Sequence, residues 1–144
     1  MDKFRIREGS IEEAVWLSKQ IPEFVNPHGV SIYKERLGNV PHLVLIAEVK
    51  NQLAGFKVGY ERDDTFYSWM GAVHPNFRKR GIAKALANEQ EKWARQQNYP
   101  HITFKTRNQH RGMLIFALKN GFNIIGFKER EQIAVNRILL RKNL

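Results

Sequence analysis

Residues 71–83 read Gly-Ala-Val-His-Pro-Asn-Phe-Arg-Lys-Arg-Gly-Ile-Ala and separate two segments that differ in hydrophobic period. Before them, residues 65–73 are bulky and aromatic, as is typical of a β-strand. After them, apolar residues recur at helical spacing, as at Ile82 and Leu86, which predicts a helix from residue 82 to about residue 98. The sequence therefore predicts a strand, a short basic turn and a long helix.

The turn has the chemistry of an anion-binding site. A helix N-terminus presents free backbone N–H groups and the positive end of the helix dipole. Gly81 has no Cβ, so a phosphate can approach the main chain closely. The surrounding cations are Arg78, Lys79, Arg80 and Lys84. The anion that fits best is a pyrophosphate.

This turn resembles the acyl-CoA-binding motif of the GNAT superfamily of N-acetyltransferases, Arg/Gln-x-x-Gly-x-Gly/Ala after a strand that ends Val-x-Pro. The motif positions are occupied by Arg78, Gly81 and Ala83, behind Val73 and Pro75. A second family-like signature follows, with Asn108 and then Phe-Ala-Leu-Lys-Asn-Gly-Phe at residues 116–122. The resemblance extends over nearly the whole chain and implies a single acetyltransferase domain over residues 1–144.

The resemblance implies an α/β fold of the mixed α+β kind. Its central sheet is mixed, mostly antiparallel and has about seven strands, with helices on both faces and a splayed pair of central strands. The residue pattern predicts an antiparallel meander of strands 43–49, 53–61 and 65–73, and a strand 101–107 parallel to the last of these. The first of these strands is expected to be central, because its apolar run is nearly continuous. The other expected elements are a strand at Phe4–Ile6, a helix capped by Ser10 and Glu13, helices 30–37 and 112–120, and strands 122–127 and 134–140.

The resemblance also implies acetyl-CoA as co-substrate, without a metal ion. The main chain of residues 71–73 would bond the pantetheine arm, and N–H groups of residues 79–83 would bind the pyrophosphate. Asn108 matches the polar residue that contacts the pantetheine arm. The predicted cofactor-binding residues are Gly71, Ala72, Val73, Arg78, Lys79, Arg80, Gly81, Ile82, Ala83, Lys84, Asn108 and Phe116.

The implied reaction is direct attack of an amine on the thioester, with the oxyanion held by a backbone N–H near Ala72 or Val73. The sequence does not decide which residue is the general base. Glu61 and Glu48 lie in the predicted meander, and the other candidates are Glu129, Glu131, His74 and His110. Many family members use a Tyr to protonate the CoA thiolate, but Ala117 stands at that position here. The thiolate is therefore expected to leave unassisted, or to take its proton from water or from Tyr67.

Composition limits the alternatives. The chain of 144 residues has a formal net charge of +10 and no cysteine, which indicates an anionic partner and excludes a thiolate nucleophile. No apolar run approaches a membrane span, so a cytoplasmic protein is expected. A basic nucleic-acid-binding module and a non-catalytic acyl-CoA sensor stay as alternatives. The expected partner is a small-molecule or peptide amine, with no specific nucleic acid, and a homodimer is allowed.

Overall fold

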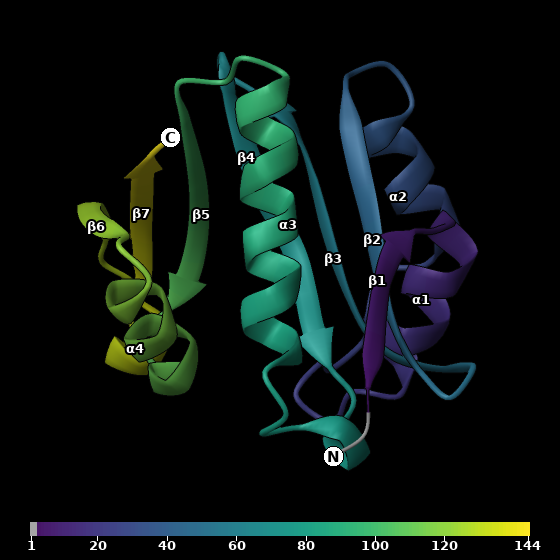
Figure 1. The fold of residues 1–144 in the computed structure, drawn as a ribbon. Coiled ribbons are helices and arrows are strands. Elements are labelled where there is room, and N and C mark those ends of the chain that lie inside the picture. Colours follow the sequence, from purple (N-terminus) through teal and green to yellow (C-terminus); the bar gives the residue numbers. More distant parts are fainter. Residues whose placement is uncertain (1–2) are drawn as a thin grey trace.

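The computed structural model describes residues 3–144 as one seven-stranded sheet with helices on both faces (Figure 1). The strands lie in the order β1-β2-β3-β4-β5-β7-β6. They are β1 (Phe4–Glu8), β2 (His42–Val49), β3 (Gln52–Arg62), β4 (Thr65–Val73), β5 (His101–Arg107), β6 (Asn123–Lys128) and β7 (Arg137–Asn143). The helices are α1 (Ile11–Lys19), α2 (Val30–Leu37), α3 (Ile82–Gln96) and α4 (Arg111–Lys119), with 3₁₀ turns at Pro75–Phe77 and Ile133–Val135. The predicted fold class is confirmed.

The sheet changes character between β4 and β5. Strands β1 to β4 pair antiparallel in sequence order, and β5, β7 and β6 form a second antiparallel group. Strands β4 and β5 are parallel and pair only at Phe66 with Ile102 and at Tyr67 with Thr103. Beyond these pairs the two strands diverge (Figure 1), so the predicted splayed pair is confirmed.

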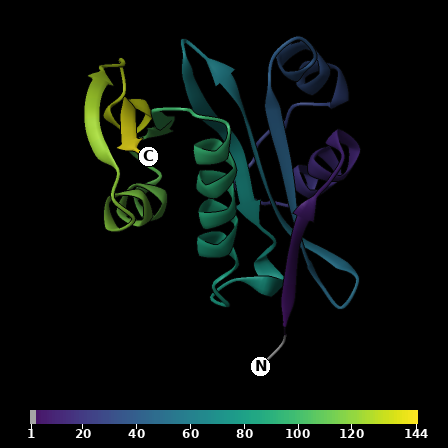
Figure 2. The same ribbon diagram turned by 45° about the horizontal axis from the view of Figure 1, so that its top comes forward.

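Helices cover both faces of the first four strands. Leu17 of α1 and Tyr33 of α2 belong to an apolar cluster on one face. Ile82 and Leu86 of α3 belong to a second cluster on the opposite face. Figure 2 shows α3 on one side of β2 to β4 and both N-terminal helices on the other. Strand β2 is therefore covered on both faces, as its apolar run indicates, although it lies next to the edge strand β1 and not at the centre of the sheet.

A β-bulge in β4 changes which of its side chains share a face. Ser68 and Met70 lie opposite consecutive residues of β3, so Trp69 has no opposite residue. One extra residue reverses the alternation of side chains along the rest of a strand. As a result Trp69, Met70 and Ala72 all pack against the cluster beneath α1 and α2.

Strand β7 begins later than the predicted start at Ala134. Residues 133–135 form the 3₁₀ turn, and the buried Asn136 holds the backbone around it. The side-chain oxygen of Asn136 accepts a hydrogen bond from the Arg130 N–H at 2.7 Å. The main-chain carbonyl oxygen of Asn136 accepts one from the Asn108 N–H at 2.8 Å. Apolar composition predicted a strand here, but these loop contacts prevent ladder pairing before Arg137.

The residue pattern also predicts a hairpin turn at Asn51-Gln52 and a core position for Leu118, and the structure corrects both. The turn after β2 is formed by Lys50 and Asn51, whose φ angles are 50° and 66°, and Gln52 already belongs to β3. Leu118 was expected in the core, but 45% of its surface is exposed. Ala117 is the buried residue of α4, because this short helix contacts the sheet along a narrow line.

The start of α1 is fixed by the predicted capping box. The Ser10 hydroxyl accepts a hydrogen bond from the Glu13 N–H at 3.1 Å, and the Glu13 carboxylate accepts one from the Ser10 N–H at 2.9 Å. Arg7 of β1 donates to Glu13 at 2.6 Å and also to Glu48 of β2. The hydrogen bond from Arg7 lowers the pKa of Glu13 to about 2, so the ion pair ties the helix to the sheet.

We expect Glu13 to contribute to stability above acid pH. Its pKa is lower in the folded state, so the stabilisation is complete above the ordinary value of 4.5 and is lost as the pH falls toward about 2. Glu13→Gln should lower the free energy of unfolding at neutral pH by roughly 1–2 kcal/mol and flatten its dependence on acid pH. Urea denaturation at several pH values measures both effects. Glu12→Gln, an exposed change in the same helical turn, is the control, and equal effects of the two variants would contradict the prediction.

Candidate active site

The basic turn forms an open helix N-terminus. Lys79 and Gly81 have φ angles of 64° and 83°, and Gly81 is the N-cap of α3, without a side-chain capping bond. The first helical amide with a carbonyl partner is that of Ala85, which donates to the Gly81 carbonyl oxygen at 3.0 Å. The preceding N–H groups therefore point out of the helix end, as at every helix N-terminus. A Cβ at Gly81 would meet no atom within 4 Å, so the space beside this main chain is open.

Arg78 serves the shape of this turn. Its guanidinium donates two hydrogen bonds of 2.9 Å to the Glu23 carboxylate and a third, of 3.0 Å, to the Val73 carbonyl oxygen. The hydrogen bond from Arg78 also lowers the pKa of Glu23. Arg78 therefore connects the end of β4 to the segment between α1 and α2.

The other predicted cofactor residues lie around the end of the splay. Lys79, Arg80, Ala83 and Lys84 are exposed, whereas Ile82 is buried in the core. The Lys84 ammonium donates to the Asn120 side chain, which donates to the Phe116 carbonyl oxygen at 2.7 Å. The first turn of α3 and the end of α4 are therefore in contact. Asn108 follows directly after β5, so the structure brings all of these residues to the divergent ends of β4 and β5.

The edge of β4 that faces β5 forms no ladder pair over Gly71, Ala72 and Val73, although the Val73 carbonyl oxygen accepts the hydrogen bond from Arg78. A Cβ at Gly71 would lie 3.3 Å from both the Lys57 Cγ and the Phe56 carbonyl oxygen, so close packing against β3 favours glycine here. Free N–H and C=O groups of this kind can accept another extended chain. This part of β4 is the stretch to which the resemblance assigns the pantetheine arm, and β5 does not pair with it.

Aromatic side chains gather on the face of the sheet beneath α1 and α2. This aromatic cluster consists of His28, Tyr33, Tyr60, Tyr67 and Trp69. The Trp69 ring centroid lies 4.7 Å from that of Tyr33 and 5.7 Å from that of His28. The Tyr60 ring meets Trp69 and Tyr67 edge-on at 5.9 and 5.5 Å. The aromatic cluster continues along β4 from Tyr67 toward the unpaired part of the strand.

Three cations lie against the aromatic cluster. The Arg36 guanidinium is 5.0 Å from the Trp69 centroid and donates to the Tyr60 hydroxyl at 3.2 Å. The Arg62 guanidinium and the Lys105 ammonium lie 5.2 and 5.8 Å from the Tyr67 centroid. Aromatic faces attract cations, so these contacts are favourable. Tyr67 therefore has one positive group beside it from β3 and one from β5.

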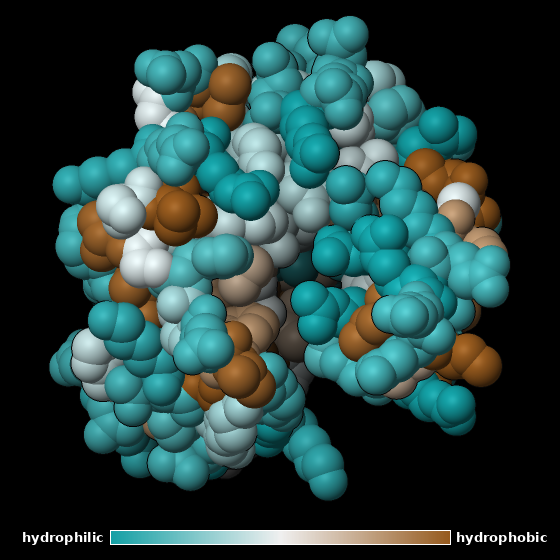
Figure 3. All heavy atoms as spheres, turned by 180° about the vertical axis from the view of Figure 1, so that it is seen from behind, coloured by the Kyte–Doolittle hydropathy of each residue, from teal (hydrophilic) through white to brown (hydrophobic). Residues whose placement is uncertain are grey.

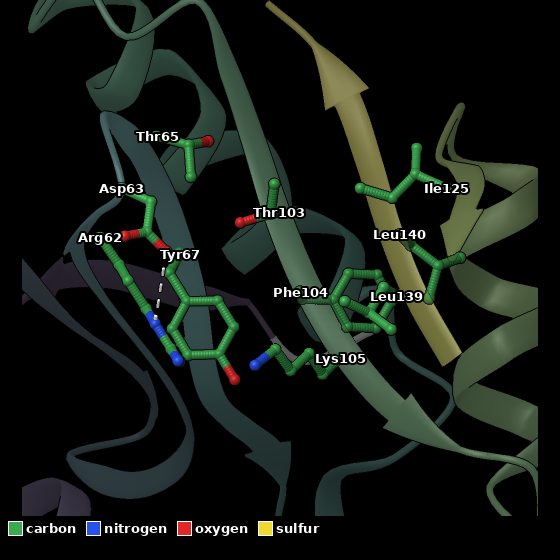
Figure 4. A pocket seen from close by; sticks show the side chains of 10 residues that line it. All are labelled: Arg62, Asp63, Thr65, Tyr67, Thr103, Phe104, Lys105, Ile125, Leu139 and Leu140. Atoms are coloured by element: carbon green, nitrogen blue, oxygen red, sulfur yellow. Dashed lines mark ion pairs between the residues drawn. The ribbon is translucent and has the colours of Figure 1, made fainter. Parts of the chain in front are cut away.

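A cavity of about 260 Å³ opens beside Tyr67, where β4 and β5 begin to diverge. Figure 4 shows Tyr67 and Lys105 pointing toward one another from neighbouring strands. From the side opposite to that of Figure 1, the surface is hollowed between its two halves, with hydrophilic residues on the rim (Figure 3). Burial and the nearby Tyr60 raise the pKa of Tyr67, so its hydroxyl stays protonated at neutral pH and can donate a hydrogen bond. The remaining lining residues are Arg62, Asp63, Thr65, Thr103, Phe104, Ile125, Leu139 and Leu140.

The structure does not bring Glu61 to this cavity. Glu61 lies opposite Phe66 in the β3–β4 ladder, and Phe66 packs in the cluster beneath α3. The Tyr99 hydroxyl donates to the Glu61 carboxylate at 3.0 Å on that face. Tyr67 belongs to the opposite face, so the two predicted catalytic side chains are separated by the sheet.

The other candidate bases are also engaged or remote. Glu48 binds Arg5 and Arg7 near the outer edge of the sheet. His74 accepts a hydrogen bond from the Asn76 N–H in the basic turn, at 3.1 Å. His110 is the exposed N-cap of α4, and Glu129 and Glu131 are exposed in the loop after β6. Within residues 3–144, Asp63 supplies the carboxylate among the residues that line the cavity.

Tyr67 and the predicted oxyanion donors lie far apart along β4. Ala72 lies five positions after Tyr67, which corresponds to about 16 Å in an extended strand. One thioester cannot contact both, since a hydrogen bond spans about 3 Å. The bulge at Trp69 lies between them and disturbs the backbone ladder next to Tyr67. Sequence reasoning missed this bulge, because one inserted residue leaves no compositional signal.

Two polar side chains beneath α3 were also missed. Burial lowers the pKa of Lys57 to about 8, partly offset by the charge of Glu91. The Gln90 side chain is fully buried, and its amide has no hydrogen-bond partner among the described residues. An apolar helical period with an isolated Gln on the buried face is the signal that could have identified Gln90.

No group of three or more His, Asp or Glu side chains within residues 3–144 is arranged to hold a metal ion. None of the described helices is both long enough and apolar enough to cross a membrane.

The sequence matches a known family over most of its length. The model of the acetyltransferase (GNAT) family matches residues 11–122. The chain is also 32% identical over 77 residues to the protein named Acetyltransferase ECA0875 of Pectobacterium atrosepticum. That match covers 54% of this chain and 55% of the relative, so the chain matches about half the length of this curated protein.

Solved structures share the fold. The ribosomal-protein-S18-alanine N-acetyltransferase from Escherichia coli superposes with a TM-score of 0.84 at 14% identity, covering 98% of this chain and 94% of that chain. A GNAT family acetyltransferase from Elizabethkingia anophelis, crystallised with acetyl-CoA bound, superposes with a TM-score of 0.77 at 20% identity over the full length of both chains. At these identities the likeness concerns the fold alone.

We expect Arg78 and Glu23 to act as one unit in holding the basic turn. Because the pair is partly exposed, Arg78→Gln and Glu23→Gln should each lower the free energy of unfolding by about 0.5–1 kcal/mol, and the double variant by little more than either. Denaturation of the four proteins of this double-mutant cycle measures the coupling. Additive losses would show that Arg78 stabilises the turn through some other contact.

Proposed function

Since the chain belongs to the acetyltransferase (GNAT) family, we propose that it transfers the acetyl group of acetyl-CoA to an amine acceptor. The observation that supports this most is the splay of β4 and β5 with the open N-terminus of α3 at its wide end. An extended anionic ligand can lie in this wedge, with its phosphates at the helix end and its chain along β4. A thioester at the far end of such a chain would reach the region of Tyr67.

Acetyl-CoA binding would use mostly backbone groups. The pyrophosphate would accept hydrogen bonds from N–H groups of residues 79–83, including Ile82, while Lys79, Arg80 and Lys84 add positive charge. The pantetheine arm would bond to the free edge of residues 71–73. Asn108 and Phe116 would contact it from the β5 and α4 side. Arg78 would act indirectly, because its guanidinium is engaged by Glu23.

The chemical step would be direct attack of a neutral amine on the thioester carbonyl carbon. The C–N bond forms, the C–S bond breaks, and the electron pair leaves with the CoA sulfur. A backbone N–H of β4 would stabilise the oxyanion. Ala72 and Val73 were predicted for this role, and the bulge at Trp69 favours a donor nearer to Tyr67.

Tyr67 would donate a hydrogen bond to the departing thiolate. Its pKa is raised above the ordinary value of 10.0, whereas a thiol has a pKa of about 8.5, so complete proton transfer from Tyr67 is unfavourable. The thiolate is itself a fairly good leaving group. Tyr67 therefore assists the reaction, and the amine proton would leave through water, because Glu61 lies on the other face of the sheet.

A homodimer is also part of the proposal. Apolar side chains are exposed on α4 and on the edge strand β6, namely Met113, Ile115, Leu118, Ile124, Ile125 and Phe127. Exposed apolar surface on an edge strand is typical of a surface that associates with another chain.

We expect acetyl-CoA to raise the melting temperature of the protein, because a ligand that binds only the native state stabilises it. Gly81→Glu should abolish this increase, since a carboxylate would occupy the space where the phosphate approaches. Gly29→Glu is the control for a new charge at a helix start, because a Cβ at Gly29 likewise meets no atom within 4 Å, at the start of α2. An unchanged acetyl-CoA shift in folded Gly81→Glu would place the phosphate site elsewhere.

We expect Tyr67→Phe to retain turnover with a loss of about 10-fold or less, because the hydroxyl assists a leaving group that can depart alone. CoA release measured with amines, polyamines, amino acids and peptides provides the assay. A loss of 10³-fold or more would make Tyr67 an essential acid. If acetyl-CoA binds and no acceptor raises CoA release above hydrolysis, the protein is an acyl-CoA sensor.

A further inference from the structure

The face of the sheet that carries Lys105 also carries an unusual excess of cations. In the ladder of β5, β7 and β6, Arg107 lies opposite Arg137, and Arg137 lies opposite Lys128. Like charges directly opposite each other in a sheet repel and are destabilising. Such a row is stable only if an anion or solvent compensates it.

Within the described residues, protein anions do little to compensate these charges. Asp63 is the carboxylate on the cavity, and its side chain is 92% exposed and 3.9 Å from the Arg62 Nε. The Arg137 Nε is buried without a hydrogen-bond partner. Burial lowers the pKa of Lys105, and so do the charges of Arg62, Lys128 and Arg137. A strongly positive field therefore acts on the cavity beside Tyr67.

The phosphates of CoA would lie too far away to be the missing anion. Val73, which leads into the basic turn, is six residues from Tyr67, or about 20 Å along an extended strand. Charges at that distance are largely screened in salt, because the Debye length is about 8 Å. Within the described residues, the cavity cations therefore have solvent and the exposed Asp63 as compensation, and a ligand anion could take the place of that solvent.

Beside these charges, the cavity wall has the polar residues Thr65 and Thr103 and a larger apolar part. Leu139 and Ile125 form the apolar part on the β7 and β6 side, whereas Arg62 and Lys105 stand on the β3 and β5 sides (Figure 4). A volume of about 260 Å³ is suited to a molecule of the size of one amino acid. The ligand that matches this wall has one anionic group and an apolar body.

We propose that the acceptor is an apolar α-amino acid whose carboxylate is bound by Arg62 and Lys105, and whose amine faces the end of the splay beside Tyr67. This inference rests on the proposed acetyl transfer and names its substrate class. The carboxylate would also supply the counter-charge that the row of Arg107, Arg137 and Lys128 lacks. Arg62 and Lys105 become the residues that determine specificity.

The same cations would help to provide a nucleophile. A neighbouring positive charge disfavours the protonated form of an amine, so its pKa falls. The groups that act on this cavity are Arg36, Arg62, Lys105, Lys128 and Arg137, opposed by Asp63. In a free amino acid the carboxylate stabilises the neighbouring ammonium form. Binding of that carboxylate by cations would remove this effect, so the amine pKa would fall toward the value of about 8 of a peptide α-amine, compared with about 10.4 for a lysine side chain. A carboxylate base is then unnecessary beside Tyr67.

The test compares each amino acid with its own amide. CoA release is measured with L-leucine, L-methionine and L-phenylalanine and with their C-terminal amides, which keep the side chain but lack the carboxylate charge. Because the amine of an amide has the lower pKa, kcat/KM is expressed per neutral amine. We expect kcat/KM to be about 10- to 100-fold higher for the acids. Arg62→Gln and Lys105→Gln should remove most of this preference and leave the amides nearly unaffected. Lys92→Gln, exposed on α3, is the charge-matched control.

A second measurement separates this inference from the proposed function. Calorimetry follows the binding of N-acetyl-L-leucine and N-acetyl-L-leucinamide to the CoA-loaded protein and to Lys105→Gln. Selective binding of the acid that depends on Lys105, without any turnover, would keep the carboxylate site and overturn the acetyl transfer. Turnover with amides equal to or better than acids, or equal losses for both in the two variants, would overturn the carboxylate site and keep the transferase.

Discussion

Only two residue pairs join β4 to β5, and the rest of the site depends on how short this pairing is. Phe66 pairs with Ile102 and Tyr67 with Thr103, after which each strand is held only from its outer side. Strand β3 supports β4 down to Val73, and β7 supports β5 down to Arg107. Because each strand has one full partner, the pair can diverge without fraying. The divergence leaves backbone hydrogen-bonding groups free inside a folded protein, which is the condition for binding an extended ligand along a strand.

The two ends of β4 carry positive charge in different ways. At the basic turn, the main positive element is the N-terminus of α3, and Arg78 is engaged in a bidentate ion pair that fixes the turn. At the Tyr67 end, the positive groups are the side chains Arg62 and Lys105, which contact an aromatic ring. A site made of backbone groups is changed little by substitutions, so it suits a phosphate group, which is the same in every acetyl-CoA molecule. A side-chain site can be changed by single substitutions, so it suits the acceptor.

The β-bulge at Trp69 lies between these two ends of β4. It places Met70 and Ala72 on the same face as Tyr67, although simple alternation would place them on the opposite face. Trp69 lies on this face by ordinary alternation from Tyr67 and packs on Tyr33 and His28, and the bulge adds Met70 and Ala72 to the same face. Bulges are frequent beside active sites, where they reorient individual side chains or backbone groups.

The sequence by itself determined the parts that depend on neighbours along the chain. The strand, turn and helix around Gly81, the capping box of Ser10 and Glu13, and the crossover from β4 to β5 all follow from local periods and from short-range backbone chemistry. The family and the location of the basic turn follow from the same residues.

Only the tertiary structure decided which face of the sheet a side chain occupies and which residues far apart in the sequence come into contact. Glu61 lies away from Tyr67 because strand pairing places it opposite Phe66, and the phase of β4 beyond Trp69 depends on the bulge. Arg78 meets Glu23 across 55 positions of sequence, and Lys105 meets Tyr67 because a helix intervenes between their parallel strands. One inserted residue reverses the alternation of side chains between the two faces of a strand. Charges far apart in sequence interact only after the strands align. The candidate acceptor cavity arises from those two effects.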